Sequence, residues 1–313
     1  MESLALEIGL VVAGFVLLIK GADGLVDGAA SLAARWGVNP LMVGLTVVAW
    51  GTSMPEVVVS GLAAWEGKPD LALGNVLGSN AANIGLVLGS AALVLPKVLE
   101  GRVEVRERVW LLGSLGVLWW VCSDSAVTRL EAGLLLALFG AYAWILWKEP
   151  RAATREEESH DARHPWLEVC LGTAGVALGA KLALDGAEGL AVRAGVSHRV
   201  IGLSLFALGT SLPELVAGLR SAVKGQADIG IGNVIGSNVF NTLAVIGIAG
   251  LARPFAQSAE MPAALARDFP INLGFALALA LAHHLHGARR SGRPIAIGML
   301  VAYVAYVAWS FAA

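Results

Sequence analysis

The chain has 313 residues, of which 57% are hydrophobic and only 15% are charged, and its mean hydropathy is +0.71. Soluble domains carry about a quarter charged residues, so this composition provides too little polar surface to cover a soluble core. The formal net charge of −2 excludes the basic surface of a nucleic-acid-binding protein. We therefore expect the whole chain to lie in a lipid bilayer. The composition points to no cofactor and no obligate protein partner.

The distribution of apolar residues predicts an all-α membrane protein. A membrane-spanning helix needs about 20 mostly apolar residues. Ten segments meet this requirement, near residues 4–33, 40–65, 71–95, 109–122, 130–147, 166–192, 199–222, 229–251, 269–286 and 294–312. A polar stretch at 148–165 divides them into two groups of five. The predicted units are a first five-helix repeat (1–147), a cytoplasmic linker (148–165) and a second five-helix repeat (166–313).

The basic residues predict the orientation. The connections after the first, third, fifth, seventh and ninth spans contain fourteen Lys and Arg residues, and the opposite side contains six. Because basic connections face the cytoplasm, we expect both termini outside, in a cell inner membrane or plasma membrane. Each half has an odd number of spans, so the two halves are expected to be inverted relative to each other.

An internal repeat marks the centre of each half. Residues 44–89 align with residues 202–247 without a gap, and 21 of the 46 positions are identical. The shared positions include Gly, Thr, Ser, Pro, Glu and Asn, which an apolar composition does not produce by chance. In transporters built from inverted repeats, the substrate lies near the bilayer midplane, where broken helices of the two halves meet. The repeat therefore predicts a transport site between residues 44–89 and 202–247.

Each copy of the repeat contains a helix-breaking proline. Pro55 and Pro213 lack a backbone N–H and clash with the carbonyl one turn earlier. We therefore expect the carbonyls of residues 49–52 and 207–210 to be loosened from the helical ladder. In lipid, such backbone survives only where it lines a polar cavity.

A glutamate follows each proline, in the middle of a span. A charged side chain at the bilayer centre costs roughly 3 kcal/mol. Glu56 and Glu214 are therefore predicted to be compensated by a bound cation or proton. The alternative is an ion pair with a basic residue of a neighbouring helix.

Few basic residues are available for such an ion pair. Lys20 and Lys181 are the basic residues expected at depth in the bilayer. Each has a closer acidic neighbour along its own helix, Asp27 and Asp185 respectively. The sequence therefore favours cation binding by the two glutamates.

The following span of each half carries polar residues at a spacing of four, which places them on one helix face. They are Asn75, Ser79 and Asn83 in the first half and Asn233, Ser237 and Asn241 in the second. Such groups can line a site or join helices by hydrogen bonds. For Asn75 and Asn233 the two roles are equally supported; the serines and the later asparagines are expected in the site.

The predicted site contains oxygen ligands only. The glutamates and amides are joined by the hydroxyls of Thr52, Ser53, Thr210 and Ser211, with no His or Cys nearby. Such a ligand set suits hard cations, calcium or sodium, and not zinc or copper.

With these residues, the chain resembles the calcium/cation antiporter superfamily, in particular its prokaryotic sodium/calcium exchangers. The resemblance lies in GTSMPE and GNVLGSNAAN of the first half, and in GTSLPEL and GNVIGSNVFN of the second. It implies that Glu56 and Glu214 bind calcium together with the carbonyls of Thr52 and Thr210. The sodium sites implied by the resemblance use both glutamates and further residues, namely Ala49, Ser53, Ala207, Ser211, Ser79 and Ser237.

The chain departs from the family pattern at two positions. Some members have a carboxylate where this chain has Asn241, which leaves two carboxylates as the only formal charges of the site. One calcium, two protons or two sodium ions would each neutralise them. Proton coupling therefore remains an alternative to sodium. At the second position, Trp50 is bulky where the second copy has Leu208.

The mechanism expected from these features is alternating access. The first and sixth spans are expected to slide over the repeat core, through contacts at Gly9, Gly14, Gly21, Gly172, Gly175 and Gly179. A channel and an intramembrane enzyme are the alternatives from other classes. The chain has no HExxH motif and no pair of mid-span aspartates of the protease type, so it is not expected to be an enzyme.

Overall fold

The computed structural model describes residues 2–100, 103–148, 164–195, 209–256, 261–285 and 292–312. The helices of the first half are α1 (Glu2–Trp36), α2 (Pro40–Val43), α3 (Ala49–Thr52), α4 (Met54–Trp65), α5 (Pro69–Ala82), α6 (Gly89–Val94), α7 (Val105–Val121) and α8 (Arg129–Trp147). Those of the second half are α9 (Pro165–Arg193), α11 (Leu212–Val223), α12 (Ala227–Phe240), α13 (Ile246–Ala252), α14 (Met261–Leu285) and α15 (Arg293–Ala312). Apart from one antiparallel bridge between Val127 and Phe255, the regular structure of this part of the chain is helical. The predicted all-α class is confirmed.

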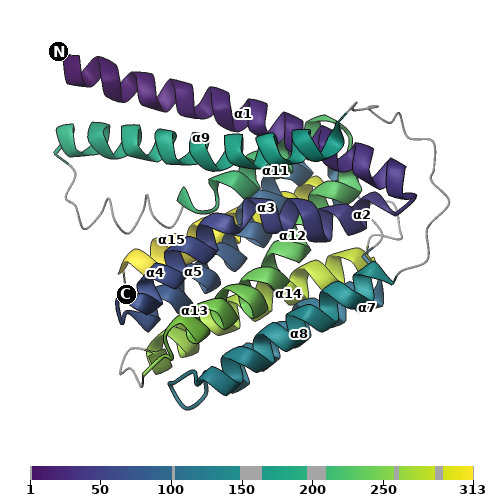
Figure 1. The fold of residues 1–313 in the computed structure, drawn as a ribbon, viewed down its shortest axis with the longest axis vertical. Helices are drawn as coiled ribbons and strands as arrows, with labels where there is room; N and C mark the ends of the chain where they lie inside the picture. Colours follow the sequence, from purple (N-terminus) through teal and green to yellow (C-terminus); the bar gives the residue numbers. More distant parts are fainter. Residues whose placement is uncertain are drawn as a thin grey trace.

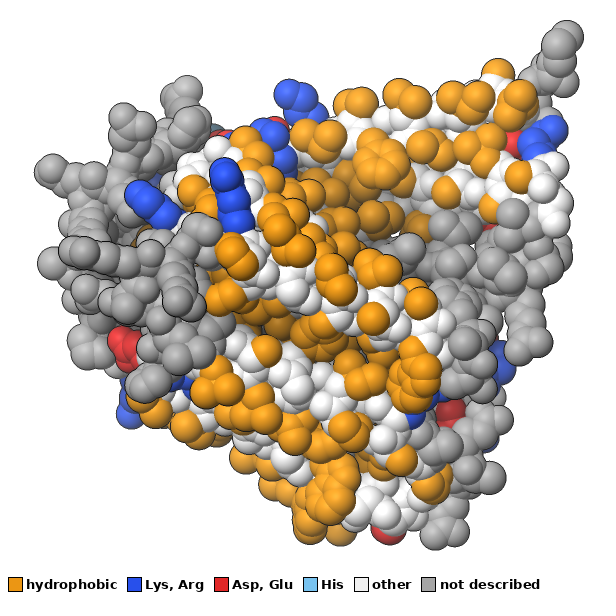
Figure 2. Space-filling model, turned by 180° about the vertical axis from the view of Figure 1, so that it is seen from behind, with side chains coloured by type: hydrophobic (Ala, Val, Ile, Leu, Met, Phe, Trp, Pro, Cys, Tyr) orange, Lys and Arg blue, Asp and Glu red, His pale blue; other side chains and the backbone are white. Residues whose placement is uncertain are grey.

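Six helices of the described residues are long and apolar enough to cross a membrane, and the pair Pro40–Thr52 and Met54–Trp65 would make a seventh. Large apolar side chains are exposed on their outer surfaces, for example Leu130 (87% exposed) and Trp147 (76%). Figure 2 shows such side chains covering much of one face of the molecule. Exposing an apolar surface of this extent is unfavourable in water and favourable in lipid. The chain is a multi-pass membrane protein, while the number of ten spans stays a prediction. The expected span 199–222 lies partly outside the described residues.

α1 and α9 form a layer of their own. They run antiparallel, side by side, across one face of the remaining helices (Figure 1). Glycines allow their backbones to touch: a Cβ on Gly21 would lie 2.6 Å from the amide nitrogen of Val176, and one on Gly179 would lie 2.5 Å from that of Leu18. The six glycines of these helices were expected to contact the repeat core. Five of them instead face the other helix of the pair, namely Gly14, Gly21, Gly172, Gly175 and Gly179, and nothing lies within 4 Å of a Cβ built on Gly9.

Turn glycines set the connection after each glutamate-bearing helix. Gly67 follows α4 with a φ of +78°, and Gly225 follows α11 with a φ of +73°. This left-handed conformation disfavours residues that have a Cβ. Both glycines belong to the internal repeat, so the sequence places the same helix-ending turn twice.

The helix that carries Glu56 is broken, as Pro55 predicts. α3 ends at Thr52 and α4 begins at Met54, with a bend of 47° between Pro40–Thr52 and Met54–Trp65. The break interrupts fewer helical hydrogen bonds than expected, because the amide of Ser53 still donates to the carbonyl of Ala49, at 3.1 Å. The expectation that the Ala49 carbonyl is freed from the ladder is therefore wrong.

The next helix of each half widens at an asparagine. α5 continues into a π-helical segment, η2 (Asn83–Leu88), and α12 continues into another, η4 (Asn241–Val245). A further π-helical segment, η1 (Gly44–Val48), precedes α3. Such widened turns add a residue to the helix, re-aim its side chains and are frequent at functional sites. Asn83 and Asn241 are the first residues of η2 and η4, and both are fully buried.

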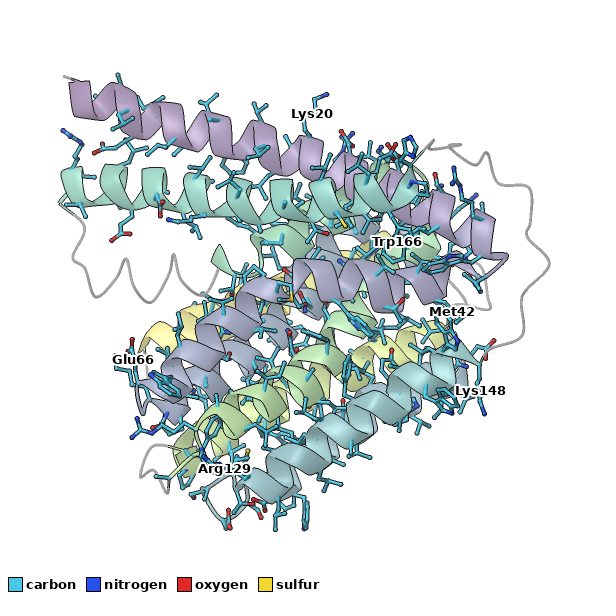
Figure 3. The ribbon with its side chains drawn as sticks, in the orientation of Figure 1. Lys20, Met42, Glu66, Arg129, Lys148 and Trp166 are labelled. Atoms are coloured by element: carbon cyan, nitrogen blue, oxygen red, sulfur yellow. The ribbon has the colours of Figure 1, made fainter. Side chains whose placement is uncertain are left out.

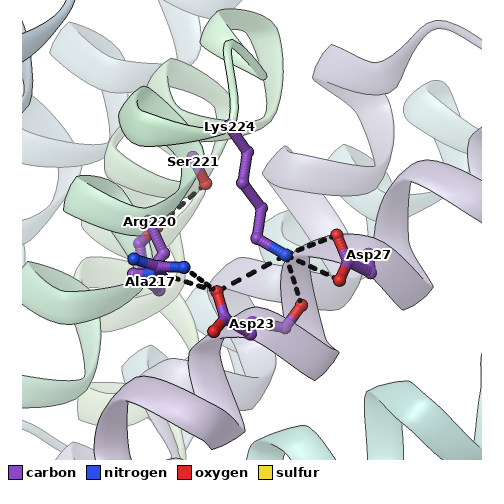
Figure 4. Close-up of polar contacts among 6 residues, drawn as sticks. All are labelled: Asp23, Asp27, Ala217, Arg220, Ser221 and Lys224. Atoms are coloured by element: carbon purple, nitrogen blue, oxygen red, sulfur yellow. Dashed lines mark hydrogen bonds and ion pairs between the residues drawn. The ribbon is translucent and has the colours of Figure 1, made fainter. Parts of the chain in front are cut away.

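A cluster of ion pairs joins α1 to α11 (Figure 4). Lys224 Nζ lies 2.6 Å from the carboxylate of Asp27, and Arg220 Nη2 lies 2.5 Å from that of Asp23. The expected partnership of Lys20 with Asp27 is therefore wrong: Lys20 is exposed and projects outward from α1 (Figure 3). Asp27 pairs with Lys224 instead, and the spacing of residues within α1 could not predict this partner. The expected pair Lys181–Asp185 is present at 2.6 Å.

Candidate functional site

The two glutamates lie inside the bundle, at corresponding points of the two halves. Glu56 is in the first turn of α4, Glu214 is in the first turn of α11, and both side chains are fully buried. The N-terminus of a helix favours negative charge, because its first amide groups are unpaired. A hydrogen bond of 2.8 Å to Glu214 Oε1 comes from Ser53, three residues before Glu56. The fold thus brings two acids from distant parts of the sequence to one place.

Neither glutamate is paired with a basic residue in the part of the chain that the structure describes. Both oxygens of Glu56 and Oε2 of Glu214 have no hydrogen-bond donor there. Leaving a buried charged group unpaired is costly. The ion-pair alternative for the glutamates is therefore not found among these residues, and the site is suited to a positive ligand.

The two halves of the site are joined directly. Ser53 Oγ, at the break between α3 and α4, donates to Glu214 Oε1 at 2.8 Å. The corresponding hydroxyl of the other half, Ser211 Oγ, is buried without a partner among the described residues. The hydroxyl oxygen of Ser211 is therefore available for a ligand, while that of Ser53 supports a carboxylate.

The threonines of both motifs donate to asparagines of the opposite half. Thr52 Oγ1 lies 3.1 Å from Asn233 Oδ1, and Thr210 Oγ1 lies 3.4 Å from Asn75 Oδ1. The sequence left the roles of Asn75 and Asn233 open between site and helix packing. The structure places both next to the site, as acceptors for its hydroxyl groups.

The serines of α5 and α12 face the same region. Ser79 Oγ lies 3.5 Å from Thr210 Oγ1, and Ser237 Oγ donates to the carbonyl of Ala49 at 3.4 Å. Both serines are buried, at 2% and 0% exposure, so their hydroxyls are shielded from lipid and water. The predicted counterpart of Ala49, Ala207, lies outside the described residues.

Two asparagines complete the set of buried oxygens. Asn83 Nδ2 donates to Asn238 Oδ1 at 3.2 Å, which leaves Asn83 Oδ1 without a donor. Neither polar atom of Asn241 has a partner among the described residues. Asn80 and Thr242 form a further contact between the halves, at 2.9 Å. Asn80, Asn238 and Thr242 were not predicted as site residues, although both asparagines belong to the repeated GSN tripeptide.

Taken together, these groups favour a hard cation as the ligand. Carboxylate, hydroxyl and amide oxygens are the ligands that calcium and sodium use in proteins. The described residues contain no group of three or more His, Cys, Asp and Glu side chains placed to hold a metal ion. Two carboxylates with neutral oxygens can neutralise one divalent or two monovalent cations, and can release them more readily than a cage of several carboxylates.

Comparison with known proteins gives a consistent result. A sequence model described as sodium/calcium exchanger protein matches residues 6–148 and 164–312. The inner membrane protein YrbG of Escherichia coli (strain K12) is 37% identical over 291 residues, which cover 88% of this chain and 88% of YrbG. The sodium/calcium exchanger MaX1 of Methanosarcina acetivorans is 31% identical over 294 residues, covering 79% of this chain and 83% of MaX1.

The fold is also similar to a solved structure. The sodium-calcium exchanger NCX_Mj, soaked with 10 mM Na+ and 10 mM Sr2+, superposes with a TM-score of 0.82. The two sequences are 29% identical, and the match covers 97% of this chain and 98% of NCX_Mj. The similarity therefore extends over the whole helical assembly and includes both halves of the candidate site.

Proposed function

Because this chain belongs to the sodium/calcium exchanger family and is thus a membrane antiporter of cations, we propose that it exchanges calcium for sodium at a site centred on Glu56 and Glu214. The observation that carries the proposal is the pair of fully buried carboxylates with three oxygens that lack a donor among the described residues. A bound cation supplies the missing positive charge.

The proposed ligands are the twelve residues that the sequence singles out. They are Glu56, Glu214, Thr52, Thr210, Ser53, Ser211, Ala49, Ala207, Ser79, Ser237, Asn83 and Asn241. Calcium takes the carboxylates with the carbonyls of the two threonines, and sodium uses overlapping oxygens. Both ions need the same carboxylates, so they compete, and one must leave before the other binds.

Alternating access follows from the cost of moving charge through an apolar medium. An empty site with two carboxylates is expensive to carry past lipid-like surface, and a site neutralised by one calcium or two sodium ions is cheaper. Movement is therefore coupled to occupancy. The proposed moving element is the layer of α1 and α9, whose backbones touch at glycines and slide over the remaining helices.

The proposed architecture is ten transmembrane helices in two inverted repeats, 1–147 and 166–313, joined by the linker 148–165. Its support is the pairing of Thr52 with Asn233 and of Thr210 with Asn75. Residues 52 and 210 are 158 positions apart (210 − 52), and so are residues 75 and 233 (233 − 75). Interchanging the two halves therefore converts one contact into the other. This is expected when a twofold axis relates the halves.

The proposed location is a cell inner membrane or plasma membrane, with both termini extracytoplasmic. The excess of Lys and Arg in alternate connections supports this orientation. α1 begins and α15 ends toward the same side of the molecule (Figure 1). The relative from Escherichia coli is named as an inner membrane protein.

Vesicle flux distinguishes sodium from proton coupling. Purified protein is reconstituted into liposomes loaded with sodium, and uptake of radioactive calcium is measured after dilution into sodium-free medium. A parallel set receives a pH gradient of the same magnitude and no sodium gradient. The proposal expects uptake with the sodium gradient. Uptake with the pH gradient alone would instead assign the chain to calcium/proton exchange, and gradient-independent flux would assign it to the channels.

A further inference from the structure

A further hydroxyl, that of a residue outside the proposed ligands, is connected to the site by hydrogen bonds. Ser60 lies one turn after Glu56 on α4 and is fully buried. Its Oγ accepts a hydrogen bond from Asn75 Nδ2 at 3.0 Å. Asn75 Oδ1 in turn accepts from Thr210 Oγ1 at 3.4 Å. A chain of two hydrogen bonds thus leads from α4 through α5 to the second motif.

The direction of these bonds matters for cation binding. A hydroxyl that coordinates a cation must point a lone pair at it, so its hydrogen must go elsewhere. Thr210 can give its hydrogen to Asn75 only if the amide oxygen, and not the amide nitrogen, faces it. An acceptor on the other side of Asn75 fixes that orientation, and Ser60 Oγ is this acceptor. The hydrogen of Ser60 is directed away, toward the carbonyl of Ala72 at 3.5 Å.

The second half lacks the equivalent group. Asn233 accepts from Thr52 as Asn75 does from Thr210, but Asn233 Nδ2 is buried without a partner among the described residues. The position that corresponds to Ser60 is Gly218 (60 + 158). A Cβ at Gly218 would lie 2.7 Å from a methyl group of Val87, so packing opposes a serine there. The asymmetry therefore has a steric origin.

We infer that Ser60 is a positioning residue of the cation site, which holds the Asn75 amide so that the Thr210 hydroxyl presents its oxygen to the ion, in addition to the carbonyl that Thr210 supplies. This inference rests on the proposed function. Its consequence is that the two halves of the site are held unequally. Thr210 is held by a chain of hydrogen bonds that ends on α4, whereas the Asn233 amide that accepts from Thr52 has no acceptor for its own Nδ2 among the described residues.

Calcium and sodium titration of purified variants tests the inference. Ser60→Ala removes the acceptor and is expected to weaken apparent calcium and sodium affinity by about fivefold, the typical net value of one hydrogen bond. Ser221→Ala is the matched control. Ser221 is also fully buried, on α11, but its hydroxyl donates to the carbonyl of Ala217 within its own helix at 2.9 Å (Figure 4). This control is expected to bind both ions as the wild type does.

A double-mutant cycle separates positioning from general packing. Asn75→Ala alone is expected to weaken ion binding at least as much as Ser60→Ala, and the double variant is expected to match Asn75→Ala alone. Ser60→Gly introduces the residue found at the corresponding position 218, and it must lose as much ion affinity as Ser60→Ala. This second variant keeps the test decisive if one of the two folds poorly. Unchanged affinity in Ser60→Ala, or additive losses in the double variant, would overturn the inference. A wild-type protein that binds neither ion would overturn the proposed function instead.

Discussion

Ser53 and Glu214 are 161 residues apart in the chain, yet the Ser53 hydroxyl donates a 2.8 Å hydrogen bond to the Glu214 carboxylate. The contact joins the helix break of the first half to the acid of the second. It makes the site a shared property of both halves, because a movement of one motif relative to the other changes the surroundings of the carboxylate. The corresponding Ser211 hydroxyl has no such partner among the described residues.

This difference between the two serines gives the first prediction. Ser53→Ala leaves Glu214 Oε1 without its donor and is expected to lower the free energy of unfolding of the ion-free protein by about 1–3 kcal/mol. Ser211→Ala removes a hydroxyl that makes no hydrogen bond with the described residues, and is expected to leave that free energy nearly unchanged. Both variants should bind sodium more weakly. Thermal unfolding in sodium-free and sodium-containing buffer measures both effects, and equal losses of ion-free stability would argue against the contact.

The second prediction concerns the charges of the glutamates. Glu56→Gln or Glu214→Gln removes a buried, uncompensated charge, so the ion-free protein should become more stable while calcium transport falls to background. Calcium-dependent protection against thermal unfolding should disappear with it.

Glu107→Gln is the control for the glutamate variants. Glu107 is equally buried, but it is paired with Arg106 at the start of α7. This variant is expected to lose stability and to keep its calcium-dependent protection. If the Glu56 and Glu214 variants retained calcium-dependent protection as well, the assignment of the site would fail.

The third prediction tests the close packing of α1 on α9. A Cβ at position 21 would lie 2.6 Å from the backbone of Val176, so Gly21→Ala must push the helices apart. Overpacking of this kind typically costs about 1–3 kcal/mol, and it should also slow exchange, because the layer of α1 and α9 is the proposed moving element. Gly9→Ala meets open space in the same helix and should be harmless. A Gly21→Ala variant with the flux and the melting temperature of Gly9→Ala would contradict the packing.

The fourth prediction concerns the ion pairs between α1 and α11. Lys224→Ala leaves the Asp27 carboxylate, about a fifth exposed, without its partner on the other helix. The melting temperature should fall, and the loss should be smaller at high salt, where the pairing contributes less. Lys181→Ala disrupts an exposed pair within α9 and should have little effect. Exchanging the charges in the double variant Asp27→Lys, Lys224→Asp should restore part of the lost stability, and failure to do so would show that the pairing is not the cause.

The sequence predicts much of this site because its key features are local. A proline followed by a glutamate marks the helix break, the spacing of four residues places Asn75, Ser79 and Asn83 on one face, and the repeat states each feature twice. Such patterns identify the helix face on which a polar group lies. They require no knowledge of how the helices pack.

The features that the sequence analysis missed depend on packing between distant segments. Asp27 meets Lys224 and not Lys20, because α1 crosses α11 at that point, and no spacing rule within α1 can reveal it. Ser60 likewise appears as an ordinary small residue of α4 until α5 places the amide of Asn75 against it. The widening of α5 at Asn83 is also a property of the packed bundle, since nothing in the local residue pattern requires a π-helical turn there.

Isothermal titration of calcium into the purified protein, with and without sodium, shows whether the two ions use the same two carboxylates. We expect one calcium ion per chain, an apparent calcium affinity that falls as the sodium concentration rises while the number of sites stays the same, and no binding in the double variant Glu56→Gln, Glu214→Gln. Calcium binding that survives in the double variant, or that is unaffected by sodium, would contradict the claim that both ions share these two carboxylates.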